Sequence, residues 1–284
     1  MRIQSRFVGP LFVFPALFVL ALLVFYPLVY TVLLSVEDPM GNFVGFENFR
    51  TVLDQRLTGT TLRNTFVYVG FSIVFQIILG TAVGILLNAE FWGRSALRAM
   101  IVVPWVIPGI VAATTWAWMF HTEFGIINYM AQGAGLIDAP VGWLTNPDTV
   151  MPALVVVNVW KMFPFVAIMV LAGLQAIPKD VYEAARIDGA RLHHEIFYVT
   201  LPQLRPVLAS LTLLLAIWGL NAITIIYAMT RGGPANRSII LPMQIFRQAF
   251  EFFQFNEAAA LSVMFLLITG VLMVLYITVF AEKE

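Results

Sequence analysis

Leu11-Phe-Val-Phe-Pro-Ala-Leu-Phe-Val-Leu-Ala-Leu-Leu-Val-Phe-Tyr-Pro-Leu-Val-Tyr-Thr-Val-Leu-Leu34 is an apolar stretch without a charged side chain. At a rise of ~1.5 Å per residue, a helix of this length exceeds the ~30 Å hydrocarbon thickness of a bilayer. Five later stretches, each with at most one charged residue, are also long enough to cross: 66–87, 99–120, 151–171, 207–229 and 258–280. The sequence therefore predicts an all-α integral membrane protein with six transmembrane helices.

The composition supports the same class of protein. Of the 284 residues, 60% are hydrophobic and only 11% are charged, whereas a soluble domain carries about 25% charged residues. The net charge is zero and no long basic run occurs, which argues against nucleic acid as a partner. The chain has no cysteine, so disulfides and thiolate metal sites are excluded. Membrane lipids are the remaining surroundings that fit this composition.

The distribution of Lys and Arg between the loops predicts the orientation. The N-terminus, 88–98, 175–206 and the C-terminus together hold nine, and the longer loops 37–64, 121–150 and 230–257 hold six. Because basic residues are enriched on the cytoplasmic side, we expect both termini and the 175–206 loop to be cytoplasmic. The expected location is the cytoplasmic (inner) membrane, crossed several times.

Residues for catalysis are not evident in the sequence. The three histidines, His121, His193 and His194, have no HExxH or HxxEH spacing, which argues against a zinc site. None of the three lysines lies in a GxxxxGK[ST] phosphate loop. Only Lys161 is ionisable within a predicted span, whereas a proton-driven transporter is expected to carry several such groups. If the protein moves a solute uphill, the energy is expected to come from another subunit.

The 175–206 loop is predicted to form two short helices. Asp180 and Glu183 have the spacing of a capping box, and Gly189 can adopt the left-handed conformation that ends a helix. A second helix is expected from about Arg191 to Val199, with Pro202 stopping it. Ala184 and Ala185 would leave a smooth strip for another protein. From these residues alone, the loop is either a solvated connector or a docking element.

The spacing within this loop has a known counterpart. Glu183-Ala184-Ala185, three residues, Gly189, nine residues, and then Val199-Thr-Leu201-Pro202 resemble the signature E-A-A-x3-G-x9-I-x-L-P. This EAA motif belongs to the membrane subunits of binding-protein-dependent ABC importers. The single departure is Val199 in the place of isoleucine.

The resemblance covers nearly the whole chain and is closest to the carbohydrate-uptake, maltose-type branch. Matching pieces are 43–49, 62–65, 103–108, 160–165, 174–178 and 230–234. Relatives of this branch often have Gly where Asn256 stands. The chain resembles the six-span core of the family, which implies the type I ABC importer permease fold. Residues 1–64 would hold the first helix and an outer loop, and 65–280 the transmembrane core with its coupling loop at 175–206.

The resemblance implies a permease subunit for a sugar or sugar-like solute, such as a di- or oligosaccharide, that is not itself an enzyme. The first loop helix would couple to a separate ATPase through Glu183, Ala184, Ala185 and Gly189, with Leu201 and Pro202 completing the motif. The implied partners are a homologous second permease, two ATPase subunits that hold ATP and Mg²⁺, and an extracytoplasmic solute-binding protein. No cofactor is expected in this chain. The alternatives are a glycerol-phosphate permease of the same branch and a membrane-embedded enzyme.

Five residues are candidates for the solute path. Asn221 lies eleven residues before Gly232 and coincides, by resemblance, with a sugar-contacting asparagine of the branch. Its amide would hydrogen-bond either a sugar or a neighbouring helix. Thr224 is expected one turn further on the same face, with Tyr227 next and Ser262 in the last span.

Lys161 has two interpretations. In the structural interpretation its ammonium would snorkel or pair with a carbonyl freed by Pro164, and in the functional one it would contact the solute or a gate. With no other cation in the spans, a sugar fits the path better than an anion does.

Overall fold

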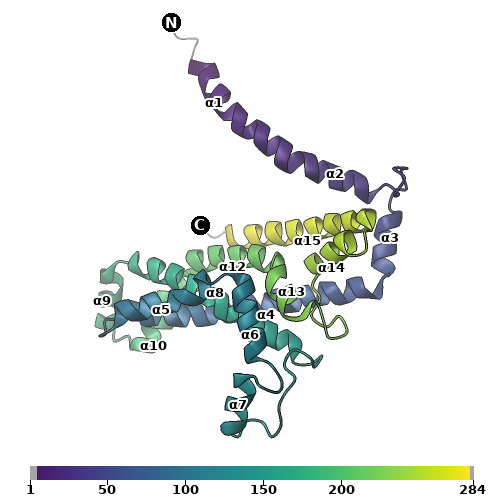
Figure 1. The fold of residues 1–284 in the computed structure, drawn as a ribbon. Helices are drawn as coiled ribbons and strands as arrows, with labels where there is room; N and C mark the ends of the chain where they lie inside the picture. The colour runs from purple at the N-terminus through teal and green to yellow at the C-terminus, as the bar shows by residue number, and fades with distance from the viewer. Residues whose placement is uncertain (1–4, 282–284) are drawn as a thin grey trace. The chain divides into compact units, whose positions relative to one another are not determined.

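A computed structural model describes residues 5–281, which fold into helices and loops without a regular strand in that range (Figure 1). Arg2 and Lys283, which enter the count of basic residues, lie outside the described residues. The first half of the chain contains α1 (Ser5–Leu20), the π-helical segment η1 (Ala21–Phe25), α2 (Tyr26–Ser35), α3 (Glu47–Asp54), α4 (Arg56–Asn88), α5 (Arg94–Val106), α6 (Gly109–Met119) and α7 (Ile126–Gly133).

The second half contains α8 (Val150–Gln175), α9 (Lys179–Ile187), α10 (Leu192–His194), the π-helical segment η2 (Glu195–Thr200), α11 (Leu201–Gln203), α12 (Arg205–Leu220), α13 (Ile223–Thr230), α14 (Leu241–Phe250) and α15 (Phe255–Ala281). The contacts between residues divide these elements into two compact units. Among the described residues, the first unit contains 5–59 together with 244–272, and the second contains 60–243 and 273–281.

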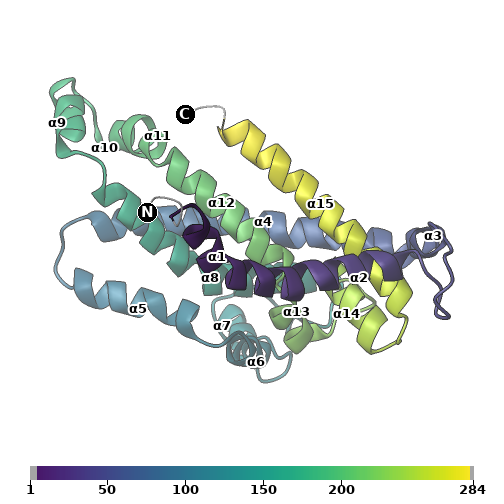
Figure 2. The same ribbon diagram turned by 90° about the horizontal axis from the view of Figure 1, so that it is seen from above.

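Four unbroken helical segments are long and apolar enough to cross a membrane: 13–35, 56–88, 150–175 and 255–278. Two bent helix pairs raise the number to six if each pair is one span, which agrees with the number predicted from the sequence. The pairs are α5 with α6, bent by 95°, and Leu192–Gln203 with α12, bent by 64° (Figure 2).

The span predicted at 99–120 is thus a bent pair of helices rather than one continuous helix. Its helix ends at Val106 and a new helix begins at Gly109. Pro108 explains the break, because proline has no N–H for a helical hydrogen bond and disfavours helical backbone in the residue before it. The span predicted at 207–229 is also interrupted, at Asn221 and Ala222 between α12 and α13.

In the first unit, two asparagines hold the end of α2. The Asn48 amide donates to the carbonyls of Ser35 and Glu37, at 3.0 and 2.9 Å. The Asn256 amide, at the start of α15, donates to the carbonyls of Leu34 and Glu37, at 3.1 and 2.7 Å. The last carbonyls of a helix have no partner within it, so these side chains satisfy them. Over most of its length before this point, the segment 13–35 is exposed.

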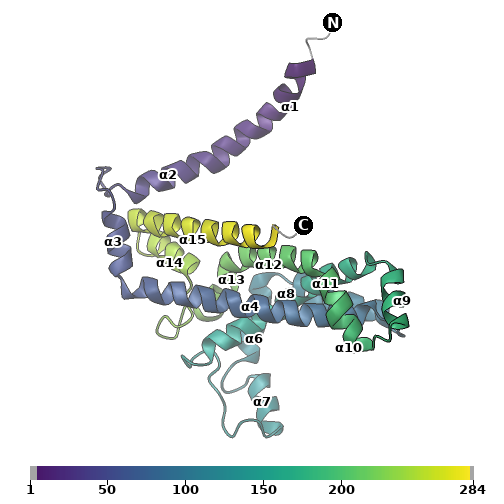
Figure 3. The same ribbon diagram turned by 180° about the vertical axis from the view of Figure 1, so that it is seen from behind.

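In the second unit, α8 is the central helix and contributes much of the core. Val166, Val170 and Leu174 pack with three leucines of the 204–215 segment: Leu204, Leu211 and Leu215. Helix α4 approaches α8 at Gly80 and Gly84, where an added Cβ would lie 2.4 Å from Val166 Cβ and 2.7 Å from Val170 Cγ1. Small residues four apart permit such close helix packing in membranes. Figure 3 shows α9 and α10 together at one end of this unit.

Candidate functional site

The first helix of the 175–206 loop is α9, which begins two residues earlier than the capping pattern predicts. Pro178 occupies the N-cap position, and no side chain caps the helix. Asp180 lies within the first turn, so the predicted Asp180–Glu183 capping box is wrong. Because Asp180 is near the start of the helix, its negative charge still interacts favourably with the positive N-terminal end of the helix dipole.

The predicted end of α9 is confirmed at Gly189. Its φ is +83°, a left-handed conformation that is costly for residues with a Cβ. The Gly189 N–H donates to the Arg186 carbonyl at 3.0 Å, and the Ala190 N–H donates to the Ala185 carbonyl at 2.9 Å. These two bonds close the helix and turn the chain toward the second half of the loop.

The second half is a continuous helical run of α10, η2 and α11, from Leu192 to Gln203. The prediction that Pro202 stops this helix is wrong. Pro202 lies in the first turn of α11, directly after the π-helical segment. Proline is tolerated in a first turn because the N–H it lacks is not needed there for a helical hydrogen bond, so the helix continues. The direction changes two residues later, at Leu204, before α12.

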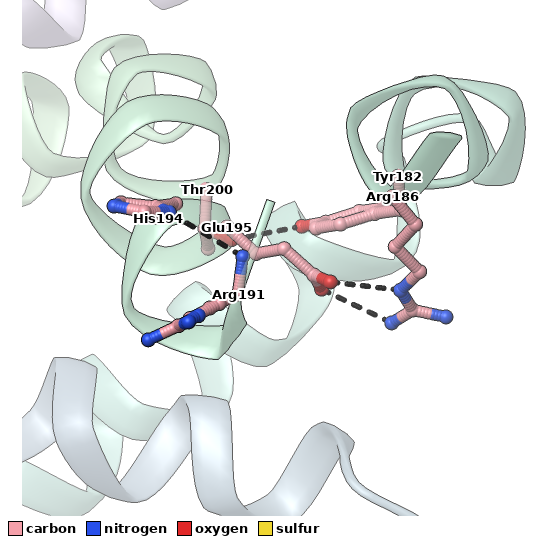
Figure 4. Close-up of polar contacts among 6 residues, drawn as sticks. All are labelled: Tyr182, Arg186, Arg191, His194, Glu195 and Thr200. Atoms are coloured by element: carbon pink, nitrogen blue, oxygen red, sulfur yellow. Dashed lines mark hydrogen bonds and ion pairs between the residues drawn. The ribbon is translucent and has the colours of Figure 1, made fainter. Parts of the chain in front are cut away.

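An ion pair joins the two halves of the loop (Figure 4). Arg186 of α9 donates from Nε to Glu195 Oε1 at 2.8 Å and from Nη2 to Glu195 Oε2 at 3.0 Å. The Glu195 side chain is 11% exposed, whereas that of Arg186 is 65% exposed. The hydrogen bonds from Arg186 lower the pKa of Glu195, and the same bonds raise the pKa of Arg186.

Further contacts support this arrangement. The hydroxyl groups of Tyr182 and Thr200 lie 3.2 Å apart, which links α9 to the end of η2. The Arg191 N–H donates to His194 Nδ1 at 3.4 Å at the start of α10. The loop is therefore an internally braced helical hairpin, with its polar contacts between α9 and the following run (Figure 4).

The outer side of the hairpin is open and partly apolar. Glu183 and Ala184 are exposed, and Ala185, Leu201 and Pro202 are half-buried. Large apolar side chains on the same loop are also uncovered, including Ile187, Leu192 and Tyr198 at 86%, 73% and 77% exposure. An ordered loop with exposed apolar side chains has the properties of a protein contact surface. In the described part of the chain, no three His, Asp or Glu side chains are grouped as a metal site.

A cavity with a mostly apolar lining and a few polar side chains lies within the second unit, between α4, α6, α8, α12 and α13. Its volume is about 190 Å³. Lys161 and Thr224, two of the predicted path residues, line it together with Ser72, Gln76 and Asn158. The apolar and small lining residues are Val69, Ile73, Gly109, Met162, Leu215, Trp218, Gly219, Ala222 and Ile225. Both helix breaks reach this cavity, through Gly109 after the first and Ala222 at the second.

Lys161 connects α8 to the first helix break. Its Nζ donates to the Ile107 carbonyl at 2.6 Å and to the Trp105 carbonyl at 3.4 Å. The predicted pairing with a carbonyl is thus present, but at the Pro108 break rather than at Pro164. A cation is favourable there, because the last carbonyls of α5 have no helical donors and form the negative end of its dipole.

Asn221 lies at the second break and is exposed. Its Nδ2 donates to the Ile217 carbonyl at 2.8 Å, within the preceding turn. It is not among the residues lining the cavity, whereas the adjacent Ala222 is. The prediction that Thr224 follows one turn later on the same face is wrong, because the helical periodicity ends at Leu220 and restarts at Ile223.

The other two candidates do not line the cavity. Tyr227 is half-buried on α13. Ser262 donates to the Ala258 carbonyl at 2.8 Å on α15 and belongs to the first unit. Of the five candidates for the solute path, only Lys161 and Thr224 therefore line the same cavity.

A row of buried polar side chains on α4 is absent from the sequence-based candidates. Thr61, Thr65, Tyr68, Ser72 and Gln76 recur every three or four residues and are all at most 3% exposed. Gln76 Nε2 donates to the Asn158 carbonyl at 3.3 Å, and Thr65 Oγ1 accepts from the Leu241 N–H at 2.9 Å. The periodicity of these residues within an apolar span is a signal that could have identified this face.

The comparisons with known proteins agree on one family. Residues 76–282 match the family model described as "Binding-protein-dependent transport system inner membrane component". The "Trehalose/maltose transport system permease protein MalF" of Thermococcus litoralis is 36% identical over 87% of this chain and 84% of its own length. The "Sulfoquinovosyl glycerol transport system permease protein SmoG" of Agrobacterium fabrum is 30% identical over 99% of this chain and 92% of its own length.

Among solved structures, the chain resembles one in a bacterial ABC transporter involved in the import of the acidic polysaccharide alginate. The TM-score is 0.88 at 20% identity, over 99% of this chain and 98% of that one. At this identity the likeness establishes a shared fold.

Proposed function

Because the chain belongs to the binding-protein-dependent transport system inner membrane components, we propose that it is the permease subunit of an ABC importer for a sugar or sugar-like solute. As a permease subunit it is not itself an enzyme, and ATP hydrolysis is located on separate subunits. The observation that best supports coupling to such subunits is the braced hairpin of the 175–206 loop. Its exposed Ala184, Ile187 and Leu192 offer a preformed surface for a partner.

The proposed assembly contains this chain, a homologous second permease, two ATPase subunits and an extracytoplasmic binding protein. Helix α9 docks on an ATPase subunit. The chain crosses the cytoplasmic (inner) membrane, with both termini and the 175–206 loop in the cytoplasm. The distribution of Lys and Arg supports this orientation. ATP and Mg²⁺ bind to the partner subunits.

Sugar as the solute class is supported by two observations. The matched relatives of Thermococcus litoralis and Agrobacterium fabrum are named for trehalose or maltose and for sulfoquinovosyl glycerol. The cavity also combines uncharged hydrogen-bonding groups of Ser72, Gln76 and Thr224 with the aromatic side chain of Trp218. Such a combination suits a ligand with hydroxyl groups and an apolar ring face.

The test is reconstitution of the chain with the permease, ATPase and binding protein encoded beside it. Candidate solutes are first identified by thermal-shift screening of that binding protein against a sugar library. In proteoliposomes, solute-loaded binding protein is expected to stimulate ATP hydrolysis and solute uptake together. Assembly without stimulation by any loaded binding protein contradicts the proposal. Preferential stimulation by glycerol phosphate supports the rival within the same branch.

A further inference from the structure

We infer that the Lys161 cavity binds a singly charged oxyanion, a carboxylate or sulfonate, on the transported saccharide. This inference rests on the proposed function and specifies its substrate class: an acidic sugar rather than a neutral one. It modifies the expectation from the sequence alone, in which Lys161 was the sole feature favouring an anion.

The first observation is a cation without a carboxylate partner. Lys161 is the only charged residue among those lining the cavity, which contain no Asp or Glu. The ion pairs Arg186–Glu195 and Arg247–Glu251 both lie elsewhere in the described part of the chain. An ammonium has three donors, and the carbonyls of Ile107 and Trp105 accept two of them. One donor therefore stays available to a ligand.

The second observation is the start of α6 at the same place. Gly109 is both the first residue of this eleven-residue helix and part of the cavity wall. The first N–H groups of a helix have no acceptor within it and form the positive end of its dipole. A Cβ added to Gly109 would lie 3.9 Å from Lys161 Cε, so the helix start and the lysine side chain are close neighbours.

The third observation is an unsatisfied donor in the cavity wall. Ser72 is 1% exposed, and its hydroxyl has no hydrogen-bond partner in the structure. Burying a hydroxyl without a partner is unfavourable. A ligand oxygen in the cavity would accept this hydrogen bond. Ser72, Lys161 and the first turn of α6 thus present donors from three different helices.

The charge balance defines the kind of anion. One ammonium and the partial charge of one helix N-terminus match a single negative charge. A phosphate monoester carries about −1.5 to −2 at pH 7 and would leave charge uncompensated. The cavity, at about 190 Å³, is below the roughly 300–1,000 Å³ of pockets that enclose drug-sized ligands. It therefore accommodates one charged end of a saccharide, with the remainder outside.

The experiment measures ligand-dependent thermal stabilisation of the full-length chain in lipid nanodiscs. D-glucuronate is compared with D-glucose and with sodium sulfate, all at constant ionic strength. Glucuronate is expected to stabilise the wild-type chain at a concentration at least tenfold below that needed for glucose, because a charge-assisted hydrogen bond contributes about 1.5–3 kcal/mol and 1.4 kcal/mol corresponds to tenfold.

Two variants separate binding from structural support. Lys161→Met is expected to remove the preference for glucuronate, but it also breaks two bonds to α5. Ser72→Ala removes only an unpartnered hydroxyl, so it should leave the unliganded melting temperature unchanged or raise it, and it should weaken glucuronate binding about fivefold. Lys179→Met, which removes the same charge from the 175–206 loop, is the matched control and should retain the wild-type preference.

Several outcomes would overturn the inference. Equal effects of glucose and glucuronate, or no effect of either, would exclude an acidic-sugar site, as would an unchanged preference in Ser72→Ala. An effect of sulfate equal to that of glucuronate would leave an inorganic-anion site and exclude the saccharide. Neutral-sugar uptake by the reconstituted transporter would meanwhile uphold the proposed function, so the two can fail separately.

Discussion

Arg186 and Glu195 form a two-point ion pair across the turn at Gly189, with N–O distances of 2.8 and 3.0 Å. The pair joins α9, which contains the Glu-Ala-Ala residues of the motif, to η2, which leads toward α12. A force applied to α9 by a bound partner would reach the membrane helices through this connection as well as through the chain itself. We expect coupling to depend on it.

Replacement of Glu195 by Gln tests this role with little change in shape. Glu195→Gln removes the charge that orients the Arg186 side chain and is expected to lower binding-protein-stimulated ATP hydrolysis severalfold without loss of assembly. Asp188→Asn is the matched control, because it removes an acidic charge from an exposed residue of the same loop. The charge-swapped pair Arg186→Glu with Glu195→Arg should recover part of the stimulation. Equal activity of Glu195→Gln and wild type would exclude the role.

The pH dependence of hairpin stability follows from the pKa of Glu195. Arg186 holds this pKa below the ordinary glutamate value of about 4.3. The carboxylate therefore stabilises the folded loop fully above that value, and the contribution is lost as the pH falls through the lowered pKa of the folded state. At pH 6, the backbone amides of α9 should be less protected from hydrogen exchange in Glu195→Gln than in the wild type. In acid, the protection in the two proteins should become equal. A difference that grows on acidification would reverse the assigned sign.

Gly189→Pro is expected to disrupt the hairpin turn. Proline fixes φ near −65°, whereas Gly189 has φ +83°. The substitution also removes the Gly189 N–H, which donates to the Arg186 carbonyl. We expect loss of solute-stimulated ATP hydrolysis in assembled transporter, measured in proteoliposomes. Gly59→Ala, at a glycine with negative φ and open space around it, should retain wild-type stimulation. Full stimulation of the proline variant would show that the turn is dispensable.

Cysteine labelling tests the proposed orientation. The chain has no native cysteine, and Asn146 and His193 are both exposed. An impermeant maleimide added to intact cells is expected to label Asn146→Cys and to spare His193→Cys, with both labelled after membrane permeabilisation. Labelling of His193→Cys alone in intact cells would invert the topology and remove the 175–206 loop from the cytoplasm.

The sequence predicts the all-helical class and the number of spans because apolar length is a local property. Gly189 is likewise predicted because its role depends on backbone conformation at one position. The 95° bend at Pro108 is not predicted, since proline is also compatible with continuous membrane helices when neighbouring groups satisfy the freed carbonyls.

The cavity could be predicted only in part. Lys161 is noticeable as the single charge in a span, but its carbonyl partners lie more than fifty positions earlier in the sequence. The periodicity of Ser72 and Gln76 marks a polar face of α4, but it does not tell which helices that face meets. The packing of α4 against α8 and α12, which forms the cavity, is a tertiary property.

Asn221 provides a test of whether the second helix break contributes to the solute path. The Asn221 Nδ2 donates to the Ile217 carbonyl in its own turn, and the side chain is otherwise exposed. If its carbonyl oxygen or second N–H binds the solute, Asn221→Leu should reduce uptake about fivefold, for a lost hydrogen bond of on the order of 1 kcal/mol. The melting temperature and basal ATP hydrolysis of the purified complex should stay unchanged. Asn221→Gln, which keeps the amide, should retain more uptake than the leucine variant. If stability and uptake decline together, or if a smaller solute is affected as strongly as a larger one, Asn221 instead supports the helix break or the contact with a second permease.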